Sequence, residues 1–253
     1  MWNMPYYQET VIAGRVMERR KKHSSRLGVK GIPRSENINP TPEEQEKVNQ
    51  ANAERNVRWL LNGNFQDGDF HMVPGFKKDL NPTPEEAIEA YNKLMRDLRR
   101  LYKKEGSELK YISAMERGER GQKKIHFHIV VNYMETKKIT ALWPWGRIRF
   151  FPLDDSGQYA DLAHYIIKRT SKTFQRGEGF KKRFNSSRNL EKPDIENEVI
   201  SAREWVKEPK PLKGYYIEKD KTVNGISKVT GYPYQFYSMV QIRPERKKVR
   251  KRE

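Results

Sequence analysis

The sequence contains no cysteine, and none of its apolar runs is long. Without cysteine the protein forms no disulfide, thiolate zinc site or cysteine nucleophile, so any metal must be held by His, Asp or Glu. No segment approaches the roughly 18 apolar residues of a membrane-spanning helix, and no apolar segment follows the N-terminus like a signal peptide. We therefore expect a soluble, unexported protein with no membrane partner, and the lack of cysteine suits a reducing cytoplasm.

Acidic residues are few relative to basic ones. The 253 residues include 51 Lys+Arg and 33 Asp+Glu, a formal net charge of +18 at pH 7. This excess is the electrostatic footprint of a protein that binds a polyanion, and nucleic acid is the first partner to consider. Basic residues concentrate in residues 168–192 and in the tail 243–253, which we expect to be disordered in isolation.

The hexapeptide Asn-Pro-Thr-Pro-Glu-Glu occurs twice, beginning at Asn39 and at Asn81. In each copy the Thr is a predicted N-cap, the next Pro takes the first helical position, and the second Glu closes a capping box. We therefore predict two helices, the first of which ends near residues 61–63. In the second, apolar residues recur at spacings of three and four after residue 83, as in an amphipathic helix.

Strand-like segments alternate with these helices, which favours an α+β fold with a mostly antiparallel sheet. Residues 27–40 and 176–193 are predicted to be surface loops. We expect one domain over residues 1–240, with a core of about 62–193, followed by a basic tail at 241–253. The predicted strands are residues 10–19, 69–73, 109–116, 124–132, 146–151 and 235–242.

Residues 109–116 and 124–132 are joined by a polar link that contains glycine, a pattern typical of a β-hairpin. Strand alternation places His126 and His128 on one face of the second strand. In a simple register Glu116 shares that face and lies opposite the histidines. The pattern thus predicts a three-ligand metal site with open positions.

Imidazole and carboxylate ligands without sulfur suit Mn²⁺ or Mg²⁺, and Zn²⁺ is a further candidate. Mn²⁺ tolerates imidazole better than Mg²⁺ does. Such an ion would act as a Lewis acid on a phosphoryl oxygen. The alternative is that the two histidines merely line a solvated sheet face.

Tyr165 lies on the polar face of a predicted helix whose apolar face runs from Tyr159 to Ile167. Lys168, three residues on, is a neighbour on the helix surface. A phenol with an ordinary pKa of about 10 is a weak nucleophile at neutral pH. A nearby ammonium favours the phenolate and can neutralise charge on a phosphorane-like transition state. We predict Tyr165 as a nucleophile with Lys168 as its cation; the alternative is a tyrosine on an ordinary helix surface.

The stretch 125–130, Ile-His-Phe-His-Ile-Val, followed by the stretch 165–168, Tyr-Ile-Ile-Lys, resembles the HUH endonucleases. That superfamily is named for two histidines around a hydrophobic residue. Over roughly residues 62–193 the chain is most similar to single-tyrosine rolling-circle replication initiator proteins of bacterial plasmids, phages and related mobile elements. Residues 187–193 carry a further part of the likeness.

The resemblance implies a central antiparallel palm sheet with helices packed on one face and a divalent ion held by Glu116, His126 and His128. It also implies that Tyr165 attacks single-stranded origin DNA at a hairpin, leaving a 5′-phosphotyrosine bond and a free 3′-OH. Host helicase and polymerase would be partners in the cytoplasm of a bacterial host cell. One departure is the segment 70–74, in which a contact of His71 with DNA, metal or nothing stays open.

A substrate strand should lie across the sheet, held by basic residues and aromatic stacking platforms. Trp143 and Trp145 are candidates for such a platform, and the alternative is that they cover the sheet edge. The candidate DNA contacts are Arg147 and Arg149 beside this platform, and Arg169, Lys172, Lys181, Lys182 and Arg183 for phosphates.

Three other functions fit parts of the pattern. A relaxase or transposase would use the same residues on a different DNA. A non-catalytic basic nucleic-acid-binding protein would need neither metal nor Tyr165. A metallohydrolase would activate water and form no covalent intermediate. The sequence has no helicase phosphate loop, so strand separation would need another protein.

Overall fold

The computed structural model describes residues 6–23, 41–118, 124–201, 205–227 and 231–242. The chain divides into two compact units. We call residues 1–36 with 194–253 the terminal unit, and residues 37–193 the central unit. The predicted core at 62–193 lies inside the central unit. A single domain over residues 1–240 stays a prediction, because two compact units can still unfold as one.

The predicted loop at 27–40 and residues 243–253 of the predicted tail lie outside the described residues. Residues 241 and 242, the start of the predicted tail, are described, and Gln241 ends a strand. In the predicted loop at 176–193, the described structure has a single two-residue strand and otherwise turns, bends and irregular backbone.

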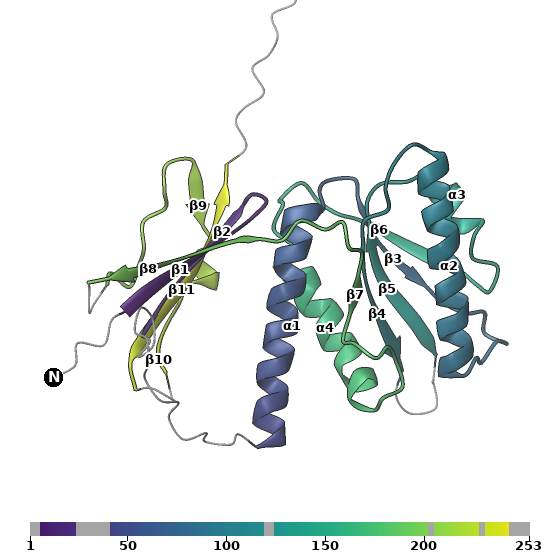
Figure 1. The fold of residues 1–253 in the computed structure, drawn as a ribbon, viewed down its shortest axis with the longest axis horizontal. Coiled ribbons are helices and arrows are strands. Elements are labelled where there is room, and N and C mark those ends of the chain that lie inside the picture. Colours follow the sequence, from purple (N-terminus) through teal and green to yellow (C-terminus); the bar gives the residue numbers. More distant parts are fainter. Residues whose placement is uncertain (1–5, 24–40, 119–123, 202–204, 228–230, 243–253) are drawn as a thin grey trace, which may run out of the picture. The chain divides into compact units, whose positions relative to one another are not determined.

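The terminal unit is built on an antiparallel sheet of six strands (Figure 1). Its order is β10-β11-β2-β1-β8, and β9 also pairs with β11. The predicted single strand at 10–19 is wrong, because Gly14 adopts a φ of 57° and turns the chain between two strands. The elements are β1 (Tyr6–Ala13), β2 (Val16–His23), β8 (Asp194–Ile200), β9 (Tyr215–Ile217), the 3-10 turn η1 (Lys219–Lys221), β10 (Val223–Ile226) and β11 (Pro233–Gln241).

The central unit contains a five-stranded antiparallel sheet in the order β6-β3-β5-β4-β7. The predicted α+β class and antiparallel pairing are confirmed. The strands are β3 (Phe70–Pro74), β4 (Tyr111–Arg117), β5 (Ile125–Val131), β6 (Ile148–Pro152) and β7 (Asn185–Ser186), and the helices are α1 (Pro42–Asn64), α2 (Pro84–Lys104), α3 (Thr136–Thr140) and α4 (Ala160–Gln175).

Both predicted capping boxes are present. Thr41 accepts a hydrogen bond from the backbone of Glu44, whose carboxylate accepts one from the backbone of Thr41. Thr83 and Glu86 make the same exchange at the start of α2. These reciprocal bonds satisfy backbone donors that the first helical turn leaves open, so local sequence fixes where each helix begins.

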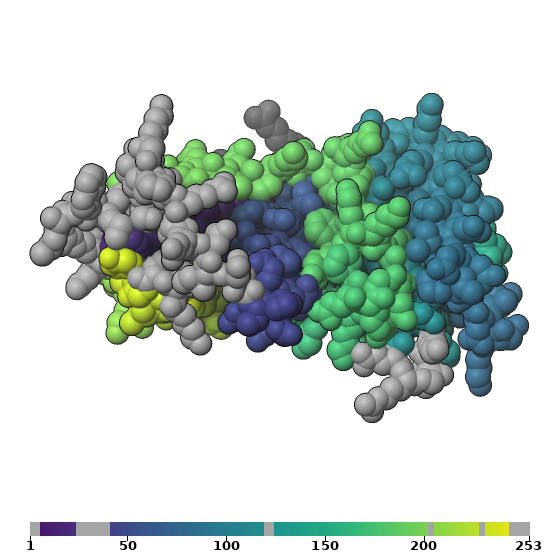
Figure 2. All heavy atoms as spheres, turned by 60° about the horizontal axis from the view of Figure 1, so that its bottom comes forward, coloured from purple at the N-terminus to yellow at the C-terminus, as the bar shows by residue number. Residues whose placement is uncertain are grey.

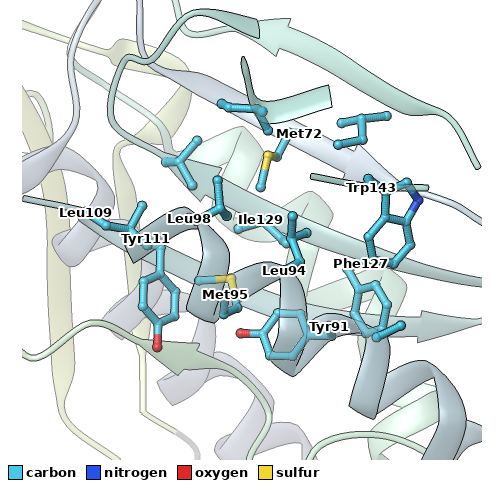
Figure 3. Close-up of a cluster of buried hydrophobic side chains, with 14 of the residues drawn as sticks. Met72, Tyr91, Leu94, Met95, Leu98, Leu109, Tyr111, Phe127, Ile129 and Trp143 are labelled. Carbon is cyan, nitrogen blue, oxygen red and sulfur yellow. The ribbon is translucent and has the colours of Figure 1, made fainter. Parts of the chain in front are cut away.

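Helix α2 packs against one face of the central sheet (Figure 3). Alternate residues of β5, Phe127 and Ile129, point to this face and are fully buried with Leu94 and Leu98 of α2. Burial of this many apolar side chains gives the sheet a rigid backing. The opposite parity of β5, which holds the histidines, must therefore face the other way.

Helices α1 and α4 lie side by side on the other face (Figure 1; Figure 2). Their apolar residues form a second core with Ile112, Ala114 and Val130 of the sheet. The predicted single helical layer is thus replaced by helices on both faces. The reason lies in β4 and β5, whose side chains are apolar on both faces at these positions and need cover on each.

Trp143 is buried in the core on the α2 side, with 2% of its surface exposed. Its ring N–H donates a hydrogen bond to the backbone oxygen of Gly75 at 2.9 Å. Trp145 is half-buried and packs against the same core. A stacking platform on Trp143 is therefore wrong, and the alternative of an aromatic cover is correct. No helix in the described ranges is long and apolar enough to span a membrane.

Candidate active site

The pairing of β4 with β5 sets the geometry of the site. Glu116 lies directly opposite His126, and Ala114 lies opposite His128. This is the register expected from the sequence. On the neighbouring strand β3, His71 lies opposite Val130 and so shares the same face. Three strands thereby contribute polar side chains to one surface of an otherwise apolar sheet.

A row of hydrogen bonds joins three of these side chains. His71 Nε2 lies 3.1 Å from His128 Nδ1, and His128 Nε2 lies 2.9 Å from Glu116 Oε2. In the neutral form of His128, donation from Nε2 to the carboxylate leaves Nδ1 as the acceptor for His71. Both imidazoles are buried, with 5% and 2% of their surfaces exposed, so these bonds replace those that water would have made.

Tyr165 projects from α4 towards this row. Its ring centroid lies 5.5 Å from that of His128 and 6.1 Å from that of His71, edge-on to both. The side chain is 41% exposed. The apolar residues Ile166 and Ile167 anchor the helix in the core beneath, so the polar face of α4 is turned to the site.

The cation that the structure brings to Tyr165 is Arg169. Its guanidinium carbon lies 5.5 Å from the centre of the tyrosine ring, and Nη1 lies 3.9 Å from Glu116 Oε1. Lys168, which the sequence placed beside Tyr165, is exposed on the same helix. Arg169 therefore links the tyrosine to the carboxylate, and the role of Lys168 stays a prediction.

Burial and neighbouring charges set the protonation of the site. Burial, followed by the charges of His128 and Arg149, lowers the pKa of His71 from 6.5 to about 3. Burial also lowers the pKa of His126, against the opposing effect of Glu116. At Glu116 burial acts to raise the pKa, but hydrogen bonding and charge from His128 outweigh it and lower the pKa. Neutral His126 and ionised Glu116 are the forms in which these groups bind a metal.

The donor set fits a hard or borderline divalent ion. The Nδ1 atom of His126 is buried and has no hydrogen-bond partner, which is uncommon for a buried polar atom. Glu116 and His128 are bonded to each other, and in the described part of the chain no three His, Asp or Glu side chains converge as a ready-made ion site. Binding an ion here would therefore replace the Glu116–His128 hydrogen bond.

Most of the basic residues predicted to contact DNA are exposed. Arg183 differs, because it forms an ion pair with Glu46 and its guanidinium carbon lies 4.5 Å from the centre of the Phe174 ring. Its structural partners make it a weaker candidate for a phosphate contact. The exposed members of the predicted set are Arg147, Arg149, Arg169, Lys172, Lys181 and Lys182.

Residues 77–174 match the model of a protein family described as a replication-associated protein of the ORF2 type. The match runs from just before α2 almost to the end of α4 and includes Glu116, His126, His128 and Tyr165. No curated protein and no solved structure matches the chain significantly. The central unit thus resembles replication-associated proteins over the segment that carries the candidate site.

Sequence reasoning left His71 open and did not single out Phe151, which stacks on His71 from the neighbouring strand β6 with ring centroids 5.6 Å apart. The alternation of β3 gave a signal for His71, since it placed this residue opposite in facing to Met72. The identity of the partner strand was needed to place it beside His128.

The depressed pKa of His71 predicts a pH-dependent stability in the absence of metal. Between pH 6.5 and about 3 the unfolded chain would bind a proton that the folded chain does not, so stability is lost as the pH falls. Wild type should lose about 1.4 kcal/mol more per pH unit than His71→Gln between about pH 6 and pH 4. Urea unfolding in EDTA at several pH values measures this difference, and equal slopes would contradict the prediction.

Proposed function

We propose that the protein is a replication initiator of the HUH type, which nicks and rejoins one strand of origin DNA through Tyr165. The observation that carries the proposal is the position of Tyr165, edge-on to His128 and His71 and above the face that holds Glu116. The match of residues 77–174 to replication-associated proteins supports a role in replication. The basic net charge supports a nucleic-acid substrate.

In the proposed nicking step the phenolic oxygen of Tyr165 attacks the phosphorus of the scissile phosphodiester. The bond from phosphorus to the 3′-oxygen breaks, and that oxygen takes up a proton and leaves as a 3′-OH. The phenol releases its own proton to water, to which the half-exposed side chain has access. The product is a 5′-phosphotyrosine bond, and attack by a 3′-OH on this bond rejoins the strand and releases the tyrosine.

Arg169 has the charge and position to assist this attack. Its guanidinium lies near both the Tyr165 ring and the Glu116 carboxylate. A fixed cation there would favour the phenolate and stabilise negative charge on the phosphate oxygens in the transition state. Lys168, the cation predicted from sequence, would be a second contributor from the same exposed helix face.

Glu116, His126 and His128 are the residues that would hold a divalent ion, Mn²⁺ or Mg²⁺. When bound, such an ion supplies Lewis-acid polarisation of a phosphoryl oxygen. His71 would act as a positioning residue, because its contact with His128 Nδ1 fixes the ring orientation of that ligand. Its neutral form places no competing positive charge beside the ligands.

The proposal extends to the setting in which the protein works. The substrate would be a single-stranded origin, opened at a hairpin, in the cytoplasm of a bacterial host. A host helicase would separate the strands, and a host polymerase would extend the 3′-OH. The exposed basic residues named above would contact the phosphates of the bound strand. A relaxase or transposase would use the same residues, and the DNA that is cleaved would distinguish them.

The nucleophile is tested with end-labelled single-stranded oligonucleotides that tile the replicon encoding the protein. With Mn²⁺, wild type should form a covalent adduct with the fragment on the 3′ side of the nick. Tyr165→Phe should abolish the adduct, because it removes the attacking oxygen. Tyr133→Phe, at a tyrosine that is 64% exposed, is the matched control and should react like wild type. Denaturing gels report both cleavage and linkage.

Retention of the adduct in Tyr165→Phe would refute this choice of nucleophile. DNA binding without any adduct, for all oligonucleotides, would favour a non-catalytic nucleic-acid-binding protein. Cleavage without an adduct would favour a metallohydrolase.

The metal ligands are tested by titrating Mn²⁺ into the protein in a calorimeter. Glu116→Gln and His128→Asn should each weaken Mn²⁺ binding by at least about tenfold, the lower end of the loss seen for outer-shell partners. Nicking should fall in parallel. His164→Asn is the matched control, since His164 is exposed and pairs with Glu54. Unchanged Mn²⁺ affinity in both ligand variants would contradict the assignment.

A further inference from the structure

An exposed aromatic side chain, Phe151, stands on the edge strand of the central sheet. In β6, Ile148 and Phe150 pack into the core on the α2 side. The alternating residues Arg149 and Phe151 therefore face the side that carries the histidines. Phe151 is 47% exposed, although a ring of this size is normally buried where the fold allows it.

Phe151 is the outer end of a row of roughly parallel rings. Its centroid lies 5.6 Å from that of His71, at an interplanar angle of 26°. His71 in turn lies 5.3 Å from His128, at 16°. The three rings come from the adjacent strands β6, β3 and β5, whose spacing the row follows. Tyr165 sits across the inner two rings, so the row leads from the candidate nucleophile to the sheet edge.

We propose that Phe151 is a stacking platform for a nucleobase of the single-stranded DNA substrate, close to the phosphate that Tyr165 attacks. A base placed on the open part of the Phe151 ring would extend the row by one more flat group. Because every base has a π face, the platform would accept any base and would position the strand without reading its sequence. This inference rests on the proposed function for the identity of the substrate.

Arg149 supports the same binding mode. It is exposed, lies two residues from Phe151 on the same face of β6, and its charge acts on both His71 and His126. A guanidinium beside an aromatic ring is the combination that holds a phosphate and its base in many single-strand-binding grooves. The edge strand would thus supply a stacking platform, the role for which the sequence made Trp143 a candidate.

The test uses full-length Tyr165→Phe protein in EDTA, so that binding is measured without cleavage. Fluorescence anisotropy follows a labelled single strand of origin DNA and a series in which each nucleotide in turn is replaced by an abasic unit. In this parent protein an abasic unit at one position should weaken binding by roughly tenfold or more. Adding Phe151→Leu should weaken binding of intact DNA by a similar factor and cause no further loss at that abasic position.

Two control variants separate stacking from structure. Phe151→Tyr keeps a flat ring and should bind like the parent. Tyr133→Leu removes an exposed aromatic ring that contacts Phe70, whose side chain packs on the α2 side of the sheet, and should also bind like the parent. Leucine retains apolar bulk against His71, so its substitution removes chiefly the aromatic face.

Parent-like binding by Phe151→Leu would overturn the proposal, as would failure of the parent to bind any single strand. An equal loss on intact DNA and on every abasic strand would also overturn it, because Phe151 would then support the site and not a base. A base-specific loss found alongside a wild type that forms no adduct would support the stacking platform while refuting the nicking function.

Discussion

The antiparallel register of β4 against β5 is the constraint on which the candidate site depends. With Glu116 opposite His126, the carboxylate and both histidines of β5 fall on one face. A slip of one residue would turn the histidines into the α2-side core and expose Phe127 and Ile129. The full burial of these two residues therefore holds the polar site in place. The core opposite the histidines is part of the apparatus that positions them.

The second constraint is the orientation of α4. Ile166 and Ile167 are buried against Ile112, Ala114 and Val130 of the sheet, which fixes the rotation of the helix about its axis. Tyr165 is then turned towards the two imidazoles. Arg169, one turn further along, reaches both the tyrosine ring and Glu116. Apolar packing on a shared face thus brings together groups that lie about forty to fifty residues apart in the chain.

Those parts of the fold whose cause is local could be predicted from the sequence. The repeated capping boxes fixed the starts of α1 and α2, and alternation in β5 indicated which face His126 and His128 share. The hairpin of β1 and β2 was taken as one strand, because residue alternation continues past the tight turn at Gly14. Strands β8 and β10 were missed because their side chains are almost all exposed or half-exposed, so they lack a buried apolar face.

The composition of the site depended on tertiary contacts that local patterns do not encode. Lys168 and Arg169 are both helical neighbours of Tyr165, and the position of Glu116 on a separate strand distinguishes them. His71 entered the site only through the pairing of β3 with β5. Trp143, a candidate for DNA stacking on the sequence alone, is held inside the core by a hydrogen bond to Gly75.

Mass spectrometry of the protein–DNA adduct tests the central claim most directly. After nuclease and trypsin digestion, residues 150–168 form one peptide that contains both Tyr159 and Tyr165. Tyr159 is buried, and its hydroxyl donates to the backbone oxygen of Asp154, so it serves as an internal control. The account predicts a residual nucleotide phosphate on Tyr165 alone. A nucleotide on Tyr159, or on any other residue in place of Tyr165, would contradict it.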